Sequence, residues 1–198
     1  MDLMELLQGQ VGQTLLEGMS SRTGQDPSTT QSALQAAIPM LMGALKKNAS
    51  DPEKASGLMD ALMNRHNGGL LDQITDIFGG GSVNEDVVED GDKILGHVLG
   101  EKKEVVAAAL SKQTNMDTSS AMDILKMAAP VVMNMIGKKA TQHQVSDHSG
   151  LAGIIGDMLG SHDEAAQHGS LIERLLDADN DGSIVDDLFN LGRKFFGR

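Results

Sequence analysis

Apolar residues recur at steps of three and four along most of the chain, the spacing that gathers them on one face of an α-helix. The first apolar stripe consists of Leu3, Leu6, Leu7, Val11, Leu15 and Met19. Asp26 and Pro27 then form a helix start, because Asp caps free backbone N–H groups and Pro is tolerated at the first helical position. Alternation of apolar and polar residues, which would predict strands, is weak. The pattern therefore predicts an all-α fold.

The helix that starts at Pro27 is expected to end near residues 46–48, where Lys46 and Lys47 suit the negative end of the helix dipole. The same periodicity predicts further helices, at 52–64, 69–78, 85–99, 101–113, 118–139, 149–159, 169–176 and 183–196.

The sequence also contains an internal repeat. Residues 23–47 match residues 114–138, with identities at Thr23/Thr114, Asp26/Asp117, Ser28/Ser119, Leu34/Leu125, Ala37/Ala128, Pro39/Pro130, Met42/Met133 and Lys47/Lys138. A second match, between 69–79 and 150–160, has a shorter separation, which implies extra residues near 50–65 in the first copy. We therefore expect duplicated helical units, 1–82 and 83–168, followed by an EF-hand-like helix–loop–helix at 169–198.

Each copy carries a proline inside an apolar helical pattern, Pro39 in the first and Pro130 in the second. Proline removes a backbone hydrogen bond, so we expect a shared kink or break; packing is its ordinary role, and a hinge is the alternative. The stretch Ala36-Ala37-Ile38-Pro39 and its counterpart ending at Pro130 resemble the bacterial family known as domain of unknown function 937. The resemblance implies an all-α bacterial protein and no particular reaction.

Composition argues against several classes of protein. The 198 residues include 28 acidic and 16 basic side chains, no Cys, Trp or Tyr, and 4 Phe. Without Cys there is no disulfide scaffold or thiolate site, and an acidic, aromatic-poor chain does not suit nucleic acid. No apolar run is long enough for a membrane span, and the acidic residues among 1–5 are unlike a secretory signal. We expect a cytoplasmic globular protein.

A specific chemistry is indicated in the loop 177–188. Asp177, Asp179 and Asp181, followed by Gly182, match the start of an EF-hand calcium loop. Calcium takes six to eight hard oxygen ligands, so carboxylates at alternate positions converge on the ion while the glycine makes the sharp turn. Ser183 would add its backbone carbonyl. The sequence therefore predicts a Ca²⁺ site.

The loop departs from the EF-hand pattern at its last position, where Leu188 replaces the bidentate Glu. Asp187 is the expected closing carboxylate, with Asp186 as second choice, and loss of the bidentate ligand predicts weak binding. The alternative is a metal-free acidic turn in which Ser183 caps the last helix and Asp186 completes a capping box.

Other candidate groups have ordinary structural interpretations. Four histidines, His143, His148, His162 and His168, have spacings that do not align metal ligands on one helix face, which favours solvated loops. Methionine is dense, and its helical spacing favours core packing over a binding groove. These methionines are Met40, Met42, Met59, Met63, Met116, Met122, Met127, Met133 and Met135. The basic, aromatic C-terminal stretch 191–198 is expected to pack its two Phe on the body. The alternative is docking on an anionic membrane, in a groove of a partner, or against the acidic surface of a neighbouring copy.

No nucleophile motif or phosphate-binding loop is recognisable, so we expect no enzyme and no small-molecule substrate. The leading hypothesis is a non-enzymatic structural or interaction protein with calcium in its C-terminal loop, and with another protein or a second copy of itself as partner. The alternative is an oligomerising helical scaffold without a metal, which associates through its Met-rich faces and C-terminal tail.

Overall fold

The computed structural model describes residues 9–79 and 83–160 of the chain. In these ranges every regular element is a helix, which confirms the all-α expectation. The predicted calcium loop, the helices expected at 169–176 and 183–196, and the first three residues of the first apolar stripe (Leu3, Leu6 and Leu7) lie outside the described residues. None of the helices in the two ranges has the length and hydropathy that a membrane span requires.

The helices follow the sequence periodicity closely. In chain order they are α2 (Gln10–Thr23), α3 (Pro27–Ser50), α4 (Pro52–Asn64), α5 (Gly69–Asp72), α6 (Ile74–Phe78), α7 (Glu85–Leu99), the 3₁₀ turn η2 (Gly100–Lys102), α8 (Lys103–Thr114), α9 (Thr118–Gln142) and α10 (His148–Gly160). The helices predicted at 52–64 and 85–99 have those bounds. The single helix predicted at 69–78 was wrong, because the backbone of Gln73 (φ −111°, ψ 13°) leaves the helical region and separates α5 from α6.

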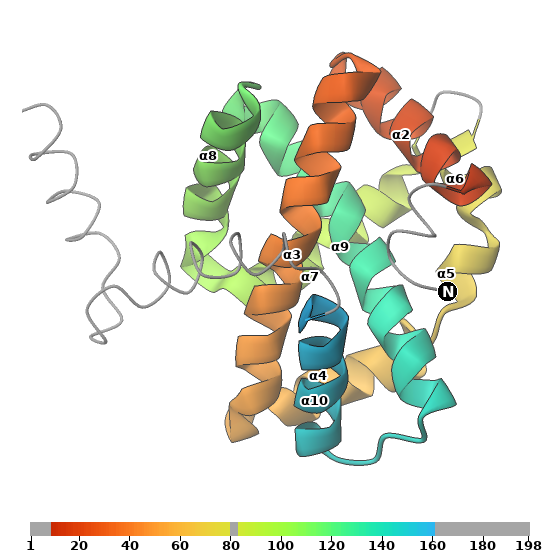
Figure 1. The fold of residues 1–198 in the computed structure, drawn as a ribbon, viewed down its shortest axis with the longest axis vertical. Helices are drawn as coiled ribbons and strands as arrows, with labels where there is room; N and C mark the ends of the chain where they lie inside the picture. The colour runs from red at the N-terminus through yellow and green to blue at the C-terminus, as the bar shows by residue number, and fades with distance from the viewer. Residues whose placement is uncertain (1–8, 80–82, 161–198) are drawn as a thin grey trace, which may run out of the picture.

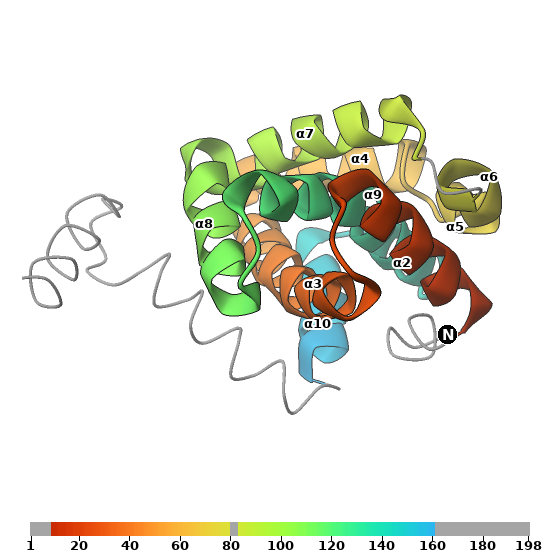
Figure 2. The same cartoon turned by 90° about the horizontal axis from the view of Figure 1, so that it is seen from above.

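The two long helices α3 and α9 pack against each other at the centre of the molecule (Figure 1). Seen from above, α7 and α4 lie on one side of this pair and α10 on the other (Figure 2). Buried apolar side chains of these helices form one hydrophobic core. That core crosses the sequence boundary between the predicted units 1–82 and 83–168, so the two ranges share their apolar interior.

Matching aspartates begin the two central helices. Asp26 caps α3 by accepting hydrogen bonds from the backbone N–H groups of Ser28 and Thr29, each at 3.0 Å, and Asp117 caps α9 by accepting from Ser120 N at 2.9 Å. Hydrogen bonds from the Ser28 hydroxyl, then from Thr29, hold the pKa of Asp26 far below its usual range. The helix start predicted at Asp26-Pro27 is therefore confirmed.

Both internal prolines lie within helices that continue past them, so neither helix is broken at Pro39 or Pro130. Pro130 has no N–H to donate to the Lys126 carbonyl one turn earlier. On the neighbouring helix α7, Gly91 faces this carbonyl so closely that a Cβ built at Gly91 would lie 1.7 Å from the Lys126 oxygen. The missing side chain at Gly91 thus allows α7 to approach the backbone of α9.

Methionine mainly fills the core. Six of the nine methionines identified from the sequence are buried, namely Met40, Met42, Met116, Met127, Met133 and Met135. Met59 and Met122 are partly buried and pack against the same core. The core interpretation of the methionine pattern is confirmed for these residues, as expected for a flexible side chain that fits irregular spaces. Met135 also borders a pocket at the surface.

Helices from the two halves of the sequence pack reciprocally on the central pair. Helix α10 lies against α3 and α5 against α9, while α8 also contacts α3 and α2 also contacts α9. The ion pair between Arg22 of α2 and Glu85 of α7 adds to these contacts. Within the second half, Asp92 of α7 pairs with Lys103 and Lys126. Each half therefore covers the long helix of the other.

Candidate binding pocket

A pocket opens between α2, α5, α9 and α10, with a volume of about 220 Å³. The residues that line it come from the two halves of the sequence and are Val11, Leu71, Asp72, Met135, Lys138, Lys139, Gln142 and Met158. Ligand sites for drug-sized molecules usually measure about 300–1,000 Å³. This pocket is smaller, and its size suits a few apolar side chains.

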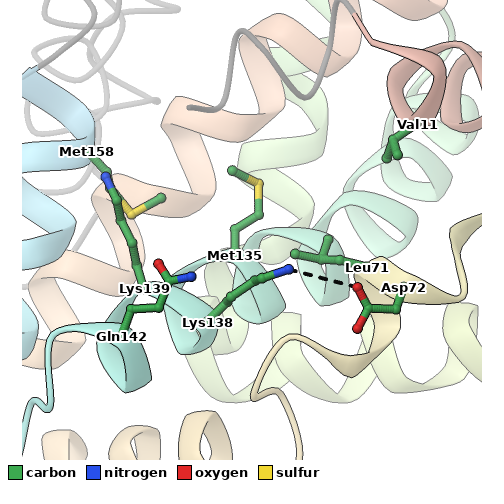
Figure 3. A pocket seen from close by; sticks show the side chains of 8 residues that line it. All are labelled: Val11, Leu71, Asp72, Met135, Lys138, Lys139, Gln142 and Met158. Carbon is green, nitrogen blue, oxygen red and sulfur yellow. Dashed lines mark ion pairs between the residues drawn. The ribbon is translucent and has the colours of Figure 1, made fainter. Parts of the chain in front are cut away.

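The pocket combines an apolar interior with a cationic rim. Met135 stands between Val11 and Leu71 on one side and Met158 on the other (Figure 3). Lys138 pairs with Asp72 at 3.8 Å, and both side chains are substantially exposed. Lys139 has no carboxylate partner among the residues that the structure describes. An occupant with apolar side chains and a nearby carboxylate therefore fits both features.

The wall formed by α5 is held in place by Asn134 of α9, one helical turn before the two lysines. The Asn134 side-chain oxygen accepts hydrogen bonds from Gly68 N at 3.1 Å and Leu70 N at 3.4 Å, and its nitrogen donates to the Pro130 carbonyl at 2.9 Å. Asn134 is 2% exposed. Since a buried amide without partners is costly, these bonds fix the chain that enters α5.

Gly68 brings this loop directly against Lys138. Its backbone has φ +109°, a conformation that favours glycine. A Cβ at Gly68 would also lie 2.9 Å from the Lys138 Cβ. The glycine therefore serves both the backbone conformation and the close contact that seats the Lys138 side chain at the pocket rim.

His66 completes the polar cluster behind the pocket wall. Its Nδ1 lies 3.3 Å from the Asn134 side-chain nitrogen, which can only donate, so Nδ1 accepts and Nε2 carries the proton of the neutral ring. Nε2 lies 3.9 Å from an Asp90 carboxylate oxygen. Burial lowers the pKa of His66. The negative charge of Asp90 acts to raise this pKa, and the positive charge of Arg65 lowers it further. The neutral ring is thus the form that the cluster accommodates.

The calcium ligands predicted from the sequence, Asp177, Asp179, Asp181, Ser183 and Asp187, lie outside the described residues. Within 9–79 and 83–160 no group of three or more His, Asp or Glu side chains is placed to hold a metal ion. His143 and His148 are exposed, as expected for solvated positions, whereas His162 and His168 lie outside the described ranges.

Sequence reasoning did not identify His66, Asn134 or Lys138 as members of a site. Asn134 did carry a signal, because it interrupts the apolar run from Val131 to Ile136, and a polar residue there predicts a buried hydrogen-bonding role. His66 and Lys138 carried none, since their neighbours in the cluster and the pocket come from distant parts of the chain.

The described part of the chain thus defines an all-helical protein with two long, proline-containing central helices and a small amphipathic pocket at their flank. The chain belongs to the family described as Bacterial protein of unknown function (DUF937), whose model matches residues 5–139. No curated protein and no solved structure matches the chain. The family match includes Asn134, Lys138 and Lys139 and ends before the Asp-rich loop.

Proposed function

We propose that this chain is a non-enzymatic interaction protein whose pocket binds an acidic amphipathic segment of a protein partner, and whose C-terminal Asp-rich loop binds calcium. The pocket carries the proposal. It offers a small apolar interior next to two lysines, and a helix that presents apolar anchors at three- and four-residue spacing with carboxylates beside them matches it.

The cationic rim supports a partner of acidic character in particular. With 28 acidic and 16 basic side chains, the chain as a whole repels acidic segments, so a local pair of lysines is required to attract one. Lys139 provides one such charge beside Met135 and Met158, and Lys138, which pairs with the exposed Asp72, provides a second. The cytoplasmic location predicted from composition belongs to this proposal.

The pocket is tested by titrating the full chain, labelled with ¹³C at its methionine methyl groups, with a synthetic helical peptide that has leucine at every third or fourth position and glutamate elsewhere. We expect saturable shifts of the Met135 and Met158 signals, while Met42, buried on α3 outside the pocket, stays unchanged. Lys138→Glu combined with Lys139→Glu should weaken binding on the order of tenfold or more, because two favourable charge contacts become repulsive.

The matched control carries Lys93→Glu and Lys112→Glu, which make the same charge change at exposed positions of α7 and α8. It should bind the peptide almost as well as the unchanged protein. Shifts that spread over all methionines, or equal losses in the two double variants, would contradict binding in the pocket.

The calcium part of the proposal depends on Asp177, Asp179 and Asp181 at alternate positions before Gly182, with the Ser183 carbonyl and Asp187 completing the ligands. We expect calorimetric heat and a higher melting temperature at millimolar calcium, and the loss of both in Asp179→Ala combined with Asp181→Ala, because two of the carboxylate ligands are removed. A control with Asp60→Ala and Asp76→Ala should retain them. Absence of heat in the unchanged chain would refute the calcium site.

The proposal includes the duplication predicted from the repeats. The reciprocal packing of α10 on α3 and of α5 on α9 supports it, because two copies that exchange equivalent helices produce such contacts. Helix α4 (Pro52–Asn64) lies where the first copy carries its extra residues, which also agrees with the change in repeat separation.

A further inference from the structure

We propose that residues 1–8 of the same chain occupy the pocket until a partner displaces them. This inference rests on the proposed function, to which it adds a resident occupant and a means of regulation. It starts from the position of the pocket next to the first described residues. Val11, which lines the pocket, is only two residues after Gly9.

The backbone at Gly9 allows the preceding segment to leave the axis of α2. Gly9 is the N-cap of α2 and has an extended conformation, with φ −82° and ψ 179°. Eight residues reach roughly 26 Å when extended and about 12 Å as a helix, so the segment can reach across the pocket from Val11 in either form.

The chemistry of the segment matches the pocket. Leu3, Leu6 and Leu7 continue the spacing of the apolar stripe that includes Val11, and they supply apolar anchors of the size that a cavity of about 220 Å³ accepts. Asp2 and Glu5 supply carboxylates for the lysine rim, where Lys139 has no carboxylate partner within the described part of the chain.

Covalent connection makes this occupant effective even if its intrinsic affinity is low. A short linker gives an effective concentration in the millimolar range, which a free partner segment must overcome. Because a partner binds only the open fraction of the pocket, its apparent affinity falls by that fraction. Residues 1–8 therefore set a threshold for partner binding.

The first test uses the full chain with Leu3→Gln, Leu6→Gln and Leu7→Gln, substitutions that leave the described body unchanged. If the segment occupies the pocket, the Met135 and Met158 methyl signals shift in this variant and the Met42 signal does not. The leucine–glutamate peptide should then bind on the order of tenfold more tightly than to the unchanged chain, since the pocket is open.

The absence of cysteine allows a second, independent test. Leu6→Cys combined with Met135→Cys should form a disulfide within one chain on air oxidation, because bridging requires the two Cβ atoms to come within about 4.5 Å. Leu6→Cys combined with Met63→Cys is the control, since Met63 lies on α4 and does not line the pocket; it should remain reduced or cross-link between molecules.

The outcomes separate this inference from the proposed function. Two results together would show that residues 1–8 do not occupy the pocket: methyl signals and peptide affinity in the triple-glutamine variant equal to those of the unchanged chain, and no internal disulfide in the variant that combines Leu6→Cys with Met135→Cys. Peptide binding to the unchanged chain would then still support the proposed function. Methyl shifts that depend on protein concentration assign the occupant to another copy and overturn the inference. If the peptide binds neither protein, both proposals fail.

Discussion

Gly91→Ala is expected to lower the free energy of unfolding by at least about 3 kcal/mol, because the new methyl group would meet the backbone of α9. Its Cβ would lie 1.7 Å from the Lys126 oxygen and 2.6 Å from the Lys126 carbonyl carbon. A backbone atom cannot rotate away as a side chain can, so α7 must shift along its whole contact with α9. Urea unfolding followed by circular dichroism measures the loss.

Gly96→Ala, on the same helix, is the matched control. No atom lies within 4 Å of a Cβ built at Gly96. Alanine there should stabilise the protein by about 0.5–1 kcal/mol, because glycine in a helix interior loses more conformational freedom on folding. If Gly91→Ala proved as stable as Gly96→Ala, the close packing of α7 on the proline-containing turn of α9 would be wrong.

Asn134→Ala is expected to cost about 2–4 kcal/mol of unfolding free energy, since it leaves buried polar groups without partners. The Gly68 and Leu70 N–H groups lose their acceptor, and the Pro130 carbonyl loses a donor. The change should also weaken binding of the leucine–glutamate peptide, because the loop leading into the pocket wall is no longer anchored. Thermal or urea unfolding and the methyl titration measure the two effects.

Asn64→Ala provides the comparison for this variant. Asn64 donates to Asp60 at 2.7 Å on an exposed part of α4, where water replaces a lost hydrogen bond. Its effect should lie within about 0.5 kcal/mol. Equal stabilities of the two alanine variants would show that Asn134 does not anchor the loop.

Gly91 and Asn134, the two positions with large expected effects, both contact the turn of α9 that contains Pro130. Gly91 lies against the Lys126 carbonyl, which receives no hydrogen bond from Pro130 because proline has no N–H. Asn134 donates a hydrogen bond to the carbonyl of Pro130 itself. Helix α7 therefore packs closely against the backbone of this turn, and the loop that leads into α5 is held to it by the hydrogen bonds of Asn134. This is a packing role for the proline, as the sequence analysis expected of such positions.

Most helices were predictable because their signals are local. Apolar spacing, Asp26 and Pro27 at a helix start, and a capping residue such as Asn84 before α7 are all properties of neighbouring residues. The exception is the predicted helix 69–78, which the structure divides where the backbone of Gln73 leaves the helical region, and no residue near Gln73 in the sequence signals that break.

The pocket was not predictable in the same way. Lysines at 138 and 139 appear in the sequence as an ordinary basic helix end. They become a rim only because α5 and α10 pack on the flanks of α9 and bring Leu71, Asp72 and Met158 beside them. No local pattern carries that information, since the lining residues belong to four separate helices.

The order of apolar and polar residues was thus sufficient to establish an all-helical chain, most helix boundaries, the proline-containing helices and the methionine-rich core, because these follow from backbone hydrogen bonding and side-chain periodicity along one segment. The roles of Gly91, Asn134, His66 and the two rim lysines depended on the packing of distant helices. Close approach, burial and hydrogen-bond partners are relations between segments, and they exist only when the core brings those segments together.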